Sequence, residues 1–260
     1  MAVVGETIKP AAPPSEPIHG ELPGDITIPL RRQRVRVYTW EVPVRVTHWV
    51  TVLSVMVLAL TGGYIGDPFL IPATPETMNT IRFIHFLTAF IFLASGIVRT
   101  YWLFAGNRFS SWRAFIPHTR RQVNEMGRQT AWYAFLRPEA PRVLGHNALA
   151  AGTYLVVFFL FLVMTITGFA LQAVHGTTPW VQLFGWVDGV FGISTVRFVH
   201  HLVMWAILAF MVHHVYSALL VDHWERNGLL GSIFSGNKFV TRQEIQEARD
   251  GGWDIQGIAE

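Results

Sequence analysis

Four histidines, at positions 200, 201, 213 and 214, stand in the otherwise apolar stretch HHLVMWAILAFMVHHVYSAL. A neutral imidazole is a common ligand of transition metals and of haem iron. Successive side chains on a helix are about 100° apart, so positions fourteen residues apart return to within about 40° of each other. His200 and His214 therefore share one helix face, but about 21 Å of helix rise separates them. That separation predicts two sites, each completed by a residue from another helix.

The elements that must position these histidines are membrane-spanning helices. Of the 260 residues, 51% are hydrophobic and only 14% are charged, which is unusual for a soluble domain of this length. A helix that crosses a hydrocarbon core of about 30 Å needs about 20 apolar residues. Runs of this length predict spans at residues 46–65, 84–105, 148–174 and 199–221. The predicted fold class is an all-α integral membrane protein with a four-helix transmembrane bundle.

Basic residues lie almost entirely on one side of these spans. Six precede the first span, eight occur from Arg99 near the end of the second span to Arg142 before the third, and four follow the fourth. The two remaining loops contain none, apart from Arg82 and Arg197 at the outer ends of the second and fourth spans. Because short loops rich in Lys and Arg stay in the cytoplasm, both termini are predicted to be cytoplasmic. The first 35 residues contain no apolar core of a cleavable signal. We divide the chain into a flexible cytoplasmic arm (1–35), a four-helix transmembrane domain (36–225) and a cytoplasmic tail (226–260).

With this topology the histidines fall into two layers. His85 and His200 lie near the outer ends of the second and fourth spans, and His48 and His214 lie near the cytoplasmic ends of the first and fourth. A pair of imidazoles can hold haem iron inside a helical bundle. Since the chain has no cysteine, cysteine-ligated iron–sulfur clusters and thioether-linked haem are excluded. The sequence predicts two haem b groups stacked across the membrane, one ligated by each pair.

Alternative interpretations of individual residues stay open. A shift of one residue would make His201 or His213 a ligand, and a single histidine near a span end can simply form hydrogen bonds. Arg82 and Arg197, one turn outside His85 and His200, are candidates for contacting haem propionates or for reaching the membrane surface. Glycines in TGGYIG and ITGFAL would permit close approach to a flat macrocycle, and they also serve ordinary helix packing.

From the arm onward, the chain resembles the b-type cytochrome subunit of membrane-bound nickel-iron hydrogenases. The stretches that carry the resemblance are VPVRVTHW, LTGGYIGDP, IRFIHF, YWLFAGNRFS, LGHNALA, TGFAL, HHLVMW and HHVYSAL. More distantly, the four-helix plan is similar to the membrane subunit of respiratory formate dehydrogenases. The resemblance implies the same four haem ligands, His48, His85, His200 and His214.

The resemblance also implies a function in the bacterial inner membrane. The chain would anchor the small and large hydrogenase subunits on the periplasmic face, without activating hydrogen itself, and would pass their electrons through two haems to membrane quinone. His146 and Asn147 are then candidates for hydrogen-bonding a quinone carbonyl, although they also suit a capped helix start. The nearly uncharged loops at 68–80 and 180–195 are the expected docking face.

Other functions make different predictions. The chain could instead serve another periplasmic oxidoreductase, such as formate dehydrogenase, with the haems kept and the donor changed. A membrane anchor without haem would use the histidines only for packing. A transporter or proton channel would need a polar line across the membrane, whereas the middle of the fourth span, VMWAILAF, is apolar.

Overall fold

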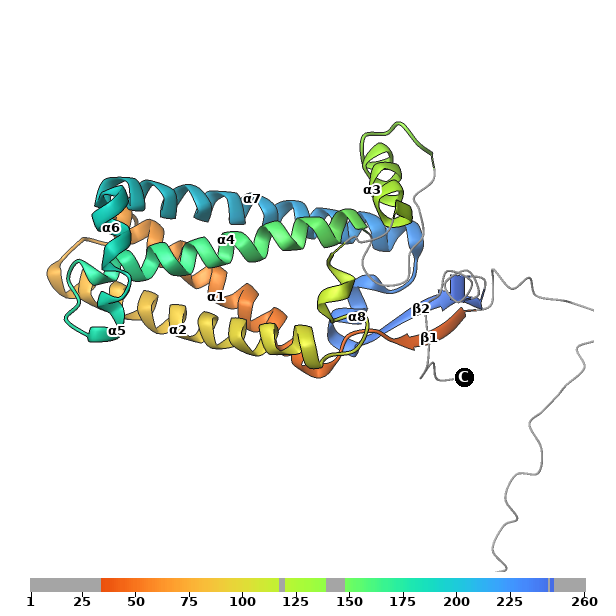
Figure 1. Cartoon of the computed structure of the whole chain (residues 1–260), viewed down its shortest axis with the longest axis horizontal. Helices are drawn as coiled ribbons and strands as arrows, with labels where there is room; N and C mark the ends of the chain where they lie inside the picture. The colour runs from red at the N-terminus through yellow and green to blue at the C-terminus, as the bar shows by residue number, and fades with distance from the viewer. Residues whose placement is uncertain (1–33, 117–119, 139–147, 243, 246–260) are drawn as a thin grey trace, which may run out of the picture.

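Four long helices lie side by side and form an elongated bundle (Figure 1). This computed structural model describes residues 34–116, 120–138, 148–242 and 244–245. The four helices are α1 (Val42–Gly66), α2 (Pro75–Ala105), α4 (Ala148–Ala173) and α7 (Ile193–Glu225). Each of them includes a segment long and apolar enough to cross a membrane. The predicted all-α membrane bundle is therefore confirmed.

Three of the four helices are longer than the apolar runs that predicted them. Helix α2 begins at Pro75, where the Thr74 side chain accepts a hydrogen bond from the backbone N–H of Thr77 at 3.1 Å. Threonine as the cap and proline in the first turn are favoured at helix starts. The polar first turns belong to the helix but lie outside the apolar run. A prediction from hydropathy alone therefore places the start of the helix too late in the sequence.

The bundle consists of two helix pairs. Close backbone contacts join α1 to α2 and α4 to α7, and they are sparse between the two pairs. Small polar residues lie at the first of these contacts, where the Ser95 hydroxyl of α2 donates to the backbone carbonyl of Thr47 in α1 at 3.2 Å. Small residues let membrane helices approach closely. Larger side chains lie between the two helix pairs, among them His48 of α1 and His214 of α7.

The short helices α5 (Pro179–Gln182) and α6 (Gly185–Phe191) cover one end of the bundle, which we call the loop end (Figure 1). A small apolar cluster of Ala170, Val187 and Val196 joins α4, α6 and α7 there. This packing holds the connection between α4 and α7 against the bundle.

The opposite end carries a two-stranded antiparallel sheet and is called the hairpin end. Strand β1 (Arg34–Tyr38) pairs with β2 (Asn237–Thr241), and the helices α3 (Arg120–Tyr133) and α8 (Leu229–Ser235) and the 3-10 turn η2 (Trp112–Ala114) lie at the same end (Figure 1). The sheet buries Val37, Val240 and Ile245. The two strands and α8 were not predicted, because segments of five to seven residues give too short a pattern to recognise. The division into arm, bundle and tail stays a prediction.

Two side chains fasten the hairpin end to the bundle. The Trp40 indole N–H donates to the Ser232 hydroxyl of α8 at 2.9 Å. The Glu41 carboxylate accepts hydrogen bonds from the Trp102 indole at 2.9 Å and from the backbone N–H of Asn107 at 2.7 Å. The start of α1 is therefore tied to the end of α2.

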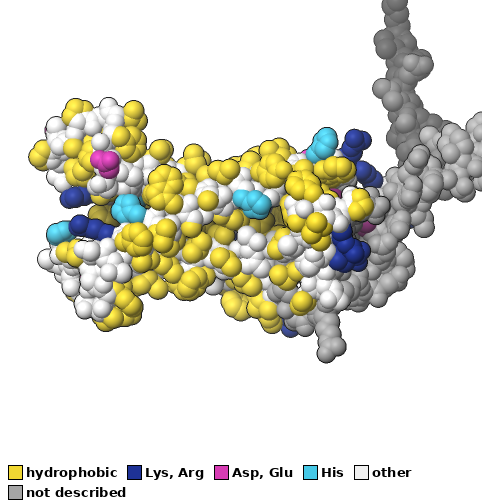
Figure 2. All heavy atoms as spheres, turned by 90° about the horizontal axis from the view of Figure 1, so that it is seen from above, with side chains coloured by type: hydrophobic (Ala, Val, Ile, Leu, Met, Phe, Trp, Pro, Cys, Tyr) yellow, Lys and Arg dark blue, Asp and Glu magenta, His cyan; other side chains and the backbone are white. Residues whose placement is uncertain are grey.

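The surface is divided in the manner expected of a membrane protein. Figure 2 shows hydrophobic side chains over the middle of the bundle, with Lys and Arg gathered towards its two ends. Only 6% of the most apolar window of α2 is fully buried inside the chain, so the faces of this helix that do not pack on α1 are open to lipid, cofactor or partner.

Candidate functional site

At the hairpin end, the structure brings together two of the histidines that the sequence predicted to pair. His48 of α1 and His214 of α7 have ring centres 6.4 Å apart, with the ring planes at 54° to each other. Aromatic rings of Phe210 and Tyr154 pack on His214, with ring centres at 5.5 and 5.9 Å. The pair thus lies across the two helix pairs, within an aromatic environment.

At the loop end, each of the other two histidines is held by a threonine of the helix it packs against. The Nδ1 atom of His85 in α2 lies 2.9 Å from the hydroxyl of Thr61 in α1. The Nδ1 atom of His200 in α7 lies 2.8 Å from the hydroxyl of Thr167 in α4. His85 lies close enough to His200 for the two imidazoles to interact electrostatically. The two helix pairs therefore repeat one arrangement around the two loop-end histidines.

The threonines determine which ring nitrogen is free. The hydroxyls of Thr61 and Thr167 each donate to a carbonyl of their own helix, of Val57 and Val163, at 2.7 Å. A hydroxyl has one hydrogen, so towards the imidazole it can only accept. Nδ1 must then carry the proton, and the lone pair lies on Nε2. A hydrogen bond of this kind orients a metal-ligating histidine and makes it a stronger ligand.

A glycine follows each of these threonines and faces the same ring. A Cβ atom at Gly62 would lie 3.2 Å from Cε1 of His85, and one at Gly168 would lie 3.3 Å from Cε1 of His200. Both distances are tighter than ordinary van der Waals contact. The glycines of TGGYIG and ITGFAL therefore allow each imidazole to lie close to the neighbouring backbone.

The described residues fit a haem held by paired imidazoles. Bonds of about 2 Å on opposite sides of one metal ion place the ligating nitrogens about 4 Å apart and the ring centres further apart, which agrees with the separation at the hairpin end. The Nδ1 atom of His48 is buried without a hydrogen-bond partner among the described residues. No cluster of three or more His, Cys, Asp or Glu residues suited to another kind of metal site occurs in the described part of the chain.

The remaining predicted residues are less informative. Arg82 and Arg197 are exposed near the loop end. His201 is half-buried, with Nδ1 2.9 Å from the Arg197 carbonyl of its own helix, whereas His213 is exposed. His146 and Asn147 lie outside the described residues. Between the two histidine layers, α7 buries only Val203 and Ile207, so it provides no polar line across the bundle.

Comparison with known proteins identifies the family. The family model described as prokaryotic cytochrome b561 matches residues 39–236, which include all four helices and both histidine layers. The chain belongs to the prokaryotic cytochrome b561 family. This cytochrome is thus a multi-pass membrane protein of a family whose members bind haem b and transfer electrons.

Relatives with curated names resemble this cytochrome over most of its length. A "Probable Ni/Fe-hydrogenase B-type cytochrome subunit" of Rhizobium leguminosarum is 36% identical over 87% of this chain and 99% of its own. The protein of the same name from Cupriavidus necator is 39% identical over 76% of this chain and 85% of its own. A "Probable Ni/Fe-hydrogenase 1 B-type cytochrome subunit" of Escherichia coli K12 is 34% identical over 76% of this chain and 89% of its own. The resemblance to these cytochrome subunits is confirmed.

Thr61 and Thr167 are functional candidates that were not predicted from the sequence. Their signal was nevertheless present, because the pair Thr-Gly occurs at 61–62 and again at 167–168, each time in a span that precedes a histidine-bearing span. The glycines drew attention for packing, and a threonine inside a membrane helix ordinarily bonds its own backbone. Only the arrangement of the helices shows that the hydroxyl oxygen also meets an imidazole.

Proposed function

We propose that this cytochrome carries electrons from a periplasmic nickel-iron hydrogenase, which it also anchors, across the bacterial inner membrane to quinone. The observation that carries the proposal is that α7 presents one histidine towards α1 at the hairpin end and another towards α2 and α4 at the loop end. The names of the relatives supply the donor.

The chain's residues have separate roles in this proposal. His85 and His200 hold one haem b at the loop end, and His48 and His214 hold the second at the hairpin end. Haem b, when bound, supplies a one-electron carrier. Thr61 and Thr167 keep the Nδ1 protons in place, and Arg82 and Arg197 face the haem propionates. Because two layers bridge opposite ends of one membrane bundle, electrons can cross without a mobile carrier.

The hydrogenase small and large subunits dock at the loop end, which lies on the periplasmic side in this proposal. Quinone is reduced near the hairpin end, and the resemblance makes His146 and Asn147 candidates for hydrogen-bonding one of its carbonyls. The basic residues that precede α1 and connect α2 to α4 support a cytoplasmic hairpin end.

An optical difference spectrum of the purified membrane complex tests the proposal. The oxidised sample is compared with samples reduced by H2 and by dithionite, and haem is counted per chain. Two b haems per chain, both reduced by H2, are expected. Haems that respond only to dithionite would overturn the hydrogenase as donor, and a single haem or none would overturn the two-site arrangement.

A further inference from the structure

The first turns of α1 carry three buried nitrogen atoms that have no hydrogen-bond partner among the described residues. They are Nε of Arg45, Nδ1 of His48 and Nε1 of Trp49. Residues three and four positions apart lie on the same face of a helix, so the three side chains project from one face of α1. Folded proteins rarely leave buried donors unpaired, because the free-energy cost is high and is highest for a charged donor. An acceptor is therefore expected at this face.

The guanidinium of Arg45 has a fixed position but no counter-charge. One of its terminal N–H groups donates to the backbone carbonyl of Phe234 in α8. This carbonyl is its one partner among the described residues. A guanidinium taken out of water needs an anion or a full set of hydrogen bonds, and its planar donors suit a carboxylate or a phosphate. The acceptor expected beside Arg45 is thus an anionic oxygen.

Trp49 adds an uncharged donor close to Arg45. The indole ring packs on the ring of Phe234, with ring centres 4.8 Å apart, and on the ring of His48, with centres 5.3 Å apart. Phe234 therefore contacts Arg45 through its carbonyl and Trp49 through its ring. An indole N–H can only donate a hydrogen bond. A charged and a neutral donor are thus held where α1 meets α8.

The position of α8 is fixed by the segment that precedes α1. The carbonyl of Gly236, directly after α8, accepts hydrogen bonds from the backbone N–H groups of Thr39 at 2.7 Å and Trp40 at 3.0 Å. Gly236 has a φ of 84°, and a Cβ atom there would lie 2.7 Å from the Trp40 carbonyl oxygen. Only glycine suits both conditions. These contacts, together with the Trp40–Ser232 hydrogen bond, hold Phe234 against α1.

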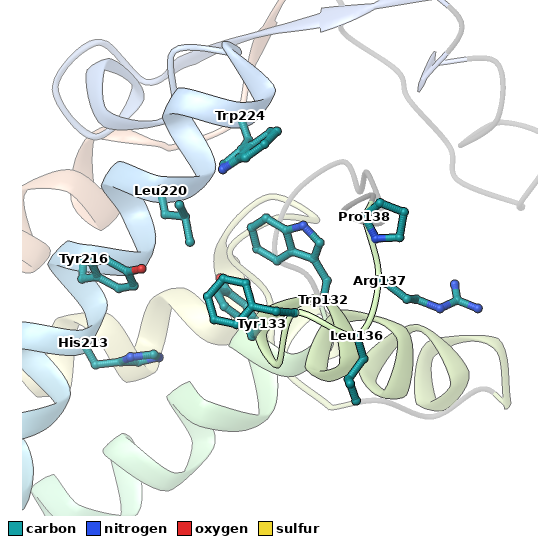
Figure 3. A pocket seen from close by; sticks show the side chains of 10 residues that line it. Trp132, Tyr133, Leu136, Arg137, Pro138, His213, Tyr216, Leu220 and Trp224 are labelled. Atoms are coloured by element: carbon teal, nitrogen blue, oxygen red, sulfur yellow. The ribbon is translucent and has the colours of Figure 1, made fainter.

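The neighbouring cavity does not supply the acceptor. A cavity of about 610 Å³ lies at the same end between α3 and α7, where Figure 3 shows Trp132 and Tyr133 pointing from α3 towards α7. None of the residues that line it belongs to α1 or α8. A ligand in that cavity would leave the N–H groups of Arg45 and Trp49 unpaired.

We propose that Arg45 and Trp49 bind a propionate carboxylate of the haem at the hairpin end, and that α8 holds both side chains in place. The inference rests on the proposed function, because it requires the haem site at His48 and His214. Haem b carries two propionate carboxylates at one edge. Arg45 lies about one helix turn from His48, on the side towards the end of the bundle. A carboxylate there satisfies both donors and neutralises the guanidinium.

The spacing of arginine and histidine agrees with this assignment. The pattern Arg-x-x-His occurs as RVTH at residues 45–48, as RFIH at 82–85 and as RFVH at 197–200. Three of the four proposed ligands therefore have an arginine one turn further out. Arg82 and Arg197 are exposed, whereas Arg45 is half-buried beneath α8. The segment that follows the last span thus becomes part of the hairpin-end haem site.

The test compares two forms of haem in the full-length chain in detergent. The chain is loaded with haem b or with haem b dimethyl ester, whose propionates are uncharged and accept weaker hydrogen bonds. Transfer of ferric haem to excess apomyoglobin is followed for the signal that His214→Ala removes. Arg45→Gln and Trp49→Phe are compared with two controls at the same end. Arg34→Gln removes an exposed arginine that also donates to a backbone carbonyl, and Trp112→Phe alters a tryptophan that is 43% exposed.

We expect release of haem b from the hairpin end to be at least about tenfold faster in Arg45→Gln and about threefold to tenfold faster in Trp49→Phe. The loop-end haem should be released at the parental rate, and the controls should match the parent. With the dimethyl ester, the parent and both variants should release the hairpin-end haem at one rate, because the charged acceptor is gone.

Parental release rates of haem b in both variants would overturn the proposal. Equal acceleration with the ester would also overturn it, since the two side chains would then only support the fold. Parental release combined with loss of bound phospholipid phosphorus in Arg45→Gln would assign the donors to a lipid phosphate instead. Absence of a hairpin-end haem from the parent would overturn the two-haem arrangement itself. These measurements involve neither H2 nor quinone, so they are independent of the proposed donor and acceptor.

Discussion

At the residue scale, the threonine beside each loop-end histidine fixes the chemistry that the histidine can perform. A hydroxyl that already donates to its own helix accepts a hydrogen bond from Nδ1–H, and Nε2 is left as the ligating atom. Among the described residues, no such hydrogen bond holds Nδ1 of His48 at the hairpin end. The two layers therefore differ in how firmly a ligand is oriented and in its donor strength.

Removing these hydroxyls should change a haem potential without removing haem. In Thr61→Val and Thr167→Val, the imidazole loses a hydrogen-bond acceptor and becomes a weaker donor to ferric iron. We expect the loop-end potential to rise by about 20 to 60 mV, the one-electron equivalent of a hydrogen bond of about 0.5 to 1.5 kcal/mol. Spectroscopic redox titration measures it. Thr165→Val is the control, because among the described residues the Thr165 hydroxyl bonds only to the Phe161 carbonyl of its own helix, at 2.9 Å. An equal shift there would contradict the mechanism.

The histidine pairs give a second prediction at this scale. His48→Ala and His214→Ala should each abolish the same haem signal and spare the other, whereas His85→Ala and His200→Ala should abolish the second signal. The low-temperature optical spectrum distinguishes the two. Loss of haem in His201→Ala or His213→Ala, with the predicted ligands dispensable, would show that the register is wrong by one residue.

At the element scale, α5 and α6 turn the predicted docking loop into a shaped surface. Leu183, Trp186 and Val190 there are between 62% and 71% exposed, although the same connection buries Val181 and Val187. The short helices thus direct some apolar side chains into the bundle and others away from it. Large exposed apolar side chains on short, packed elements are typical of a protein interface.

Charge at this surface should weaken hydrogenase attachment. We expect Trp186→Glu to raise the dissociation constant for the hydrogenase at least about tenfold, because docking would then desolvate a carboxylate in place of burying an aromatic side chain. Haem content should not change. Co-purification and binding measurements check this, with Thr177→Glu as a control that adds the same charge at the same end. If the Trp186 variant binds the hydrogenase as tightly as the parent does, the docking face is not formed by α5 and α6.

At the scale of the whole molecule, four helices bring the segments that flank the bundle to the same end. The strands β1 and β2 pair at the hairpin end, one preceding the first span and the other following the last. This pairing requires the two flanking segments to share a compartment. It agrees with the excess of basic residues at that end.

The absence of cysteine permits a direct test of orientation. A membrane-impermeant maleimide added to intact cells with a permeabilised outer membrane should label Thr177→Cys, at the loop end, and not Ser235→Cys, at the hairpin end. Both positions are exposed. Inverted membrane vesicles should give the opposite result. Labelling of Ser235→Cys from outside would reverse the proposed topology and the side on which the hydrogenase docks.

The sequence by itself determined the membrane class, the number of spans and the histidines available as ligands. A continuous apolar run of about 20 residues crosses the lipid as a helix, because a helix forms all of its backbone hydrogen bonds within the segment itself. The pairing of His48 with His214 also followed, since depth and helical face depend only on chain position. Their observed proximity agrees with that pairing, while their role as ligands stays a prediction.

The tertiary structure alone decided the contacts that join different helices. The rotation of α1 against α2, and of α4 against α7, brings Thr61 to His85 and Thr167 to His200. It also places Tyr133 of α3 opposite His213. The order of residues along one helix does not specify such rotations, because they depend on how the surfaces of two helices pack. Small residues such as Gly62 and Gly168 are compatible with more than one packing of the neighbouring helix.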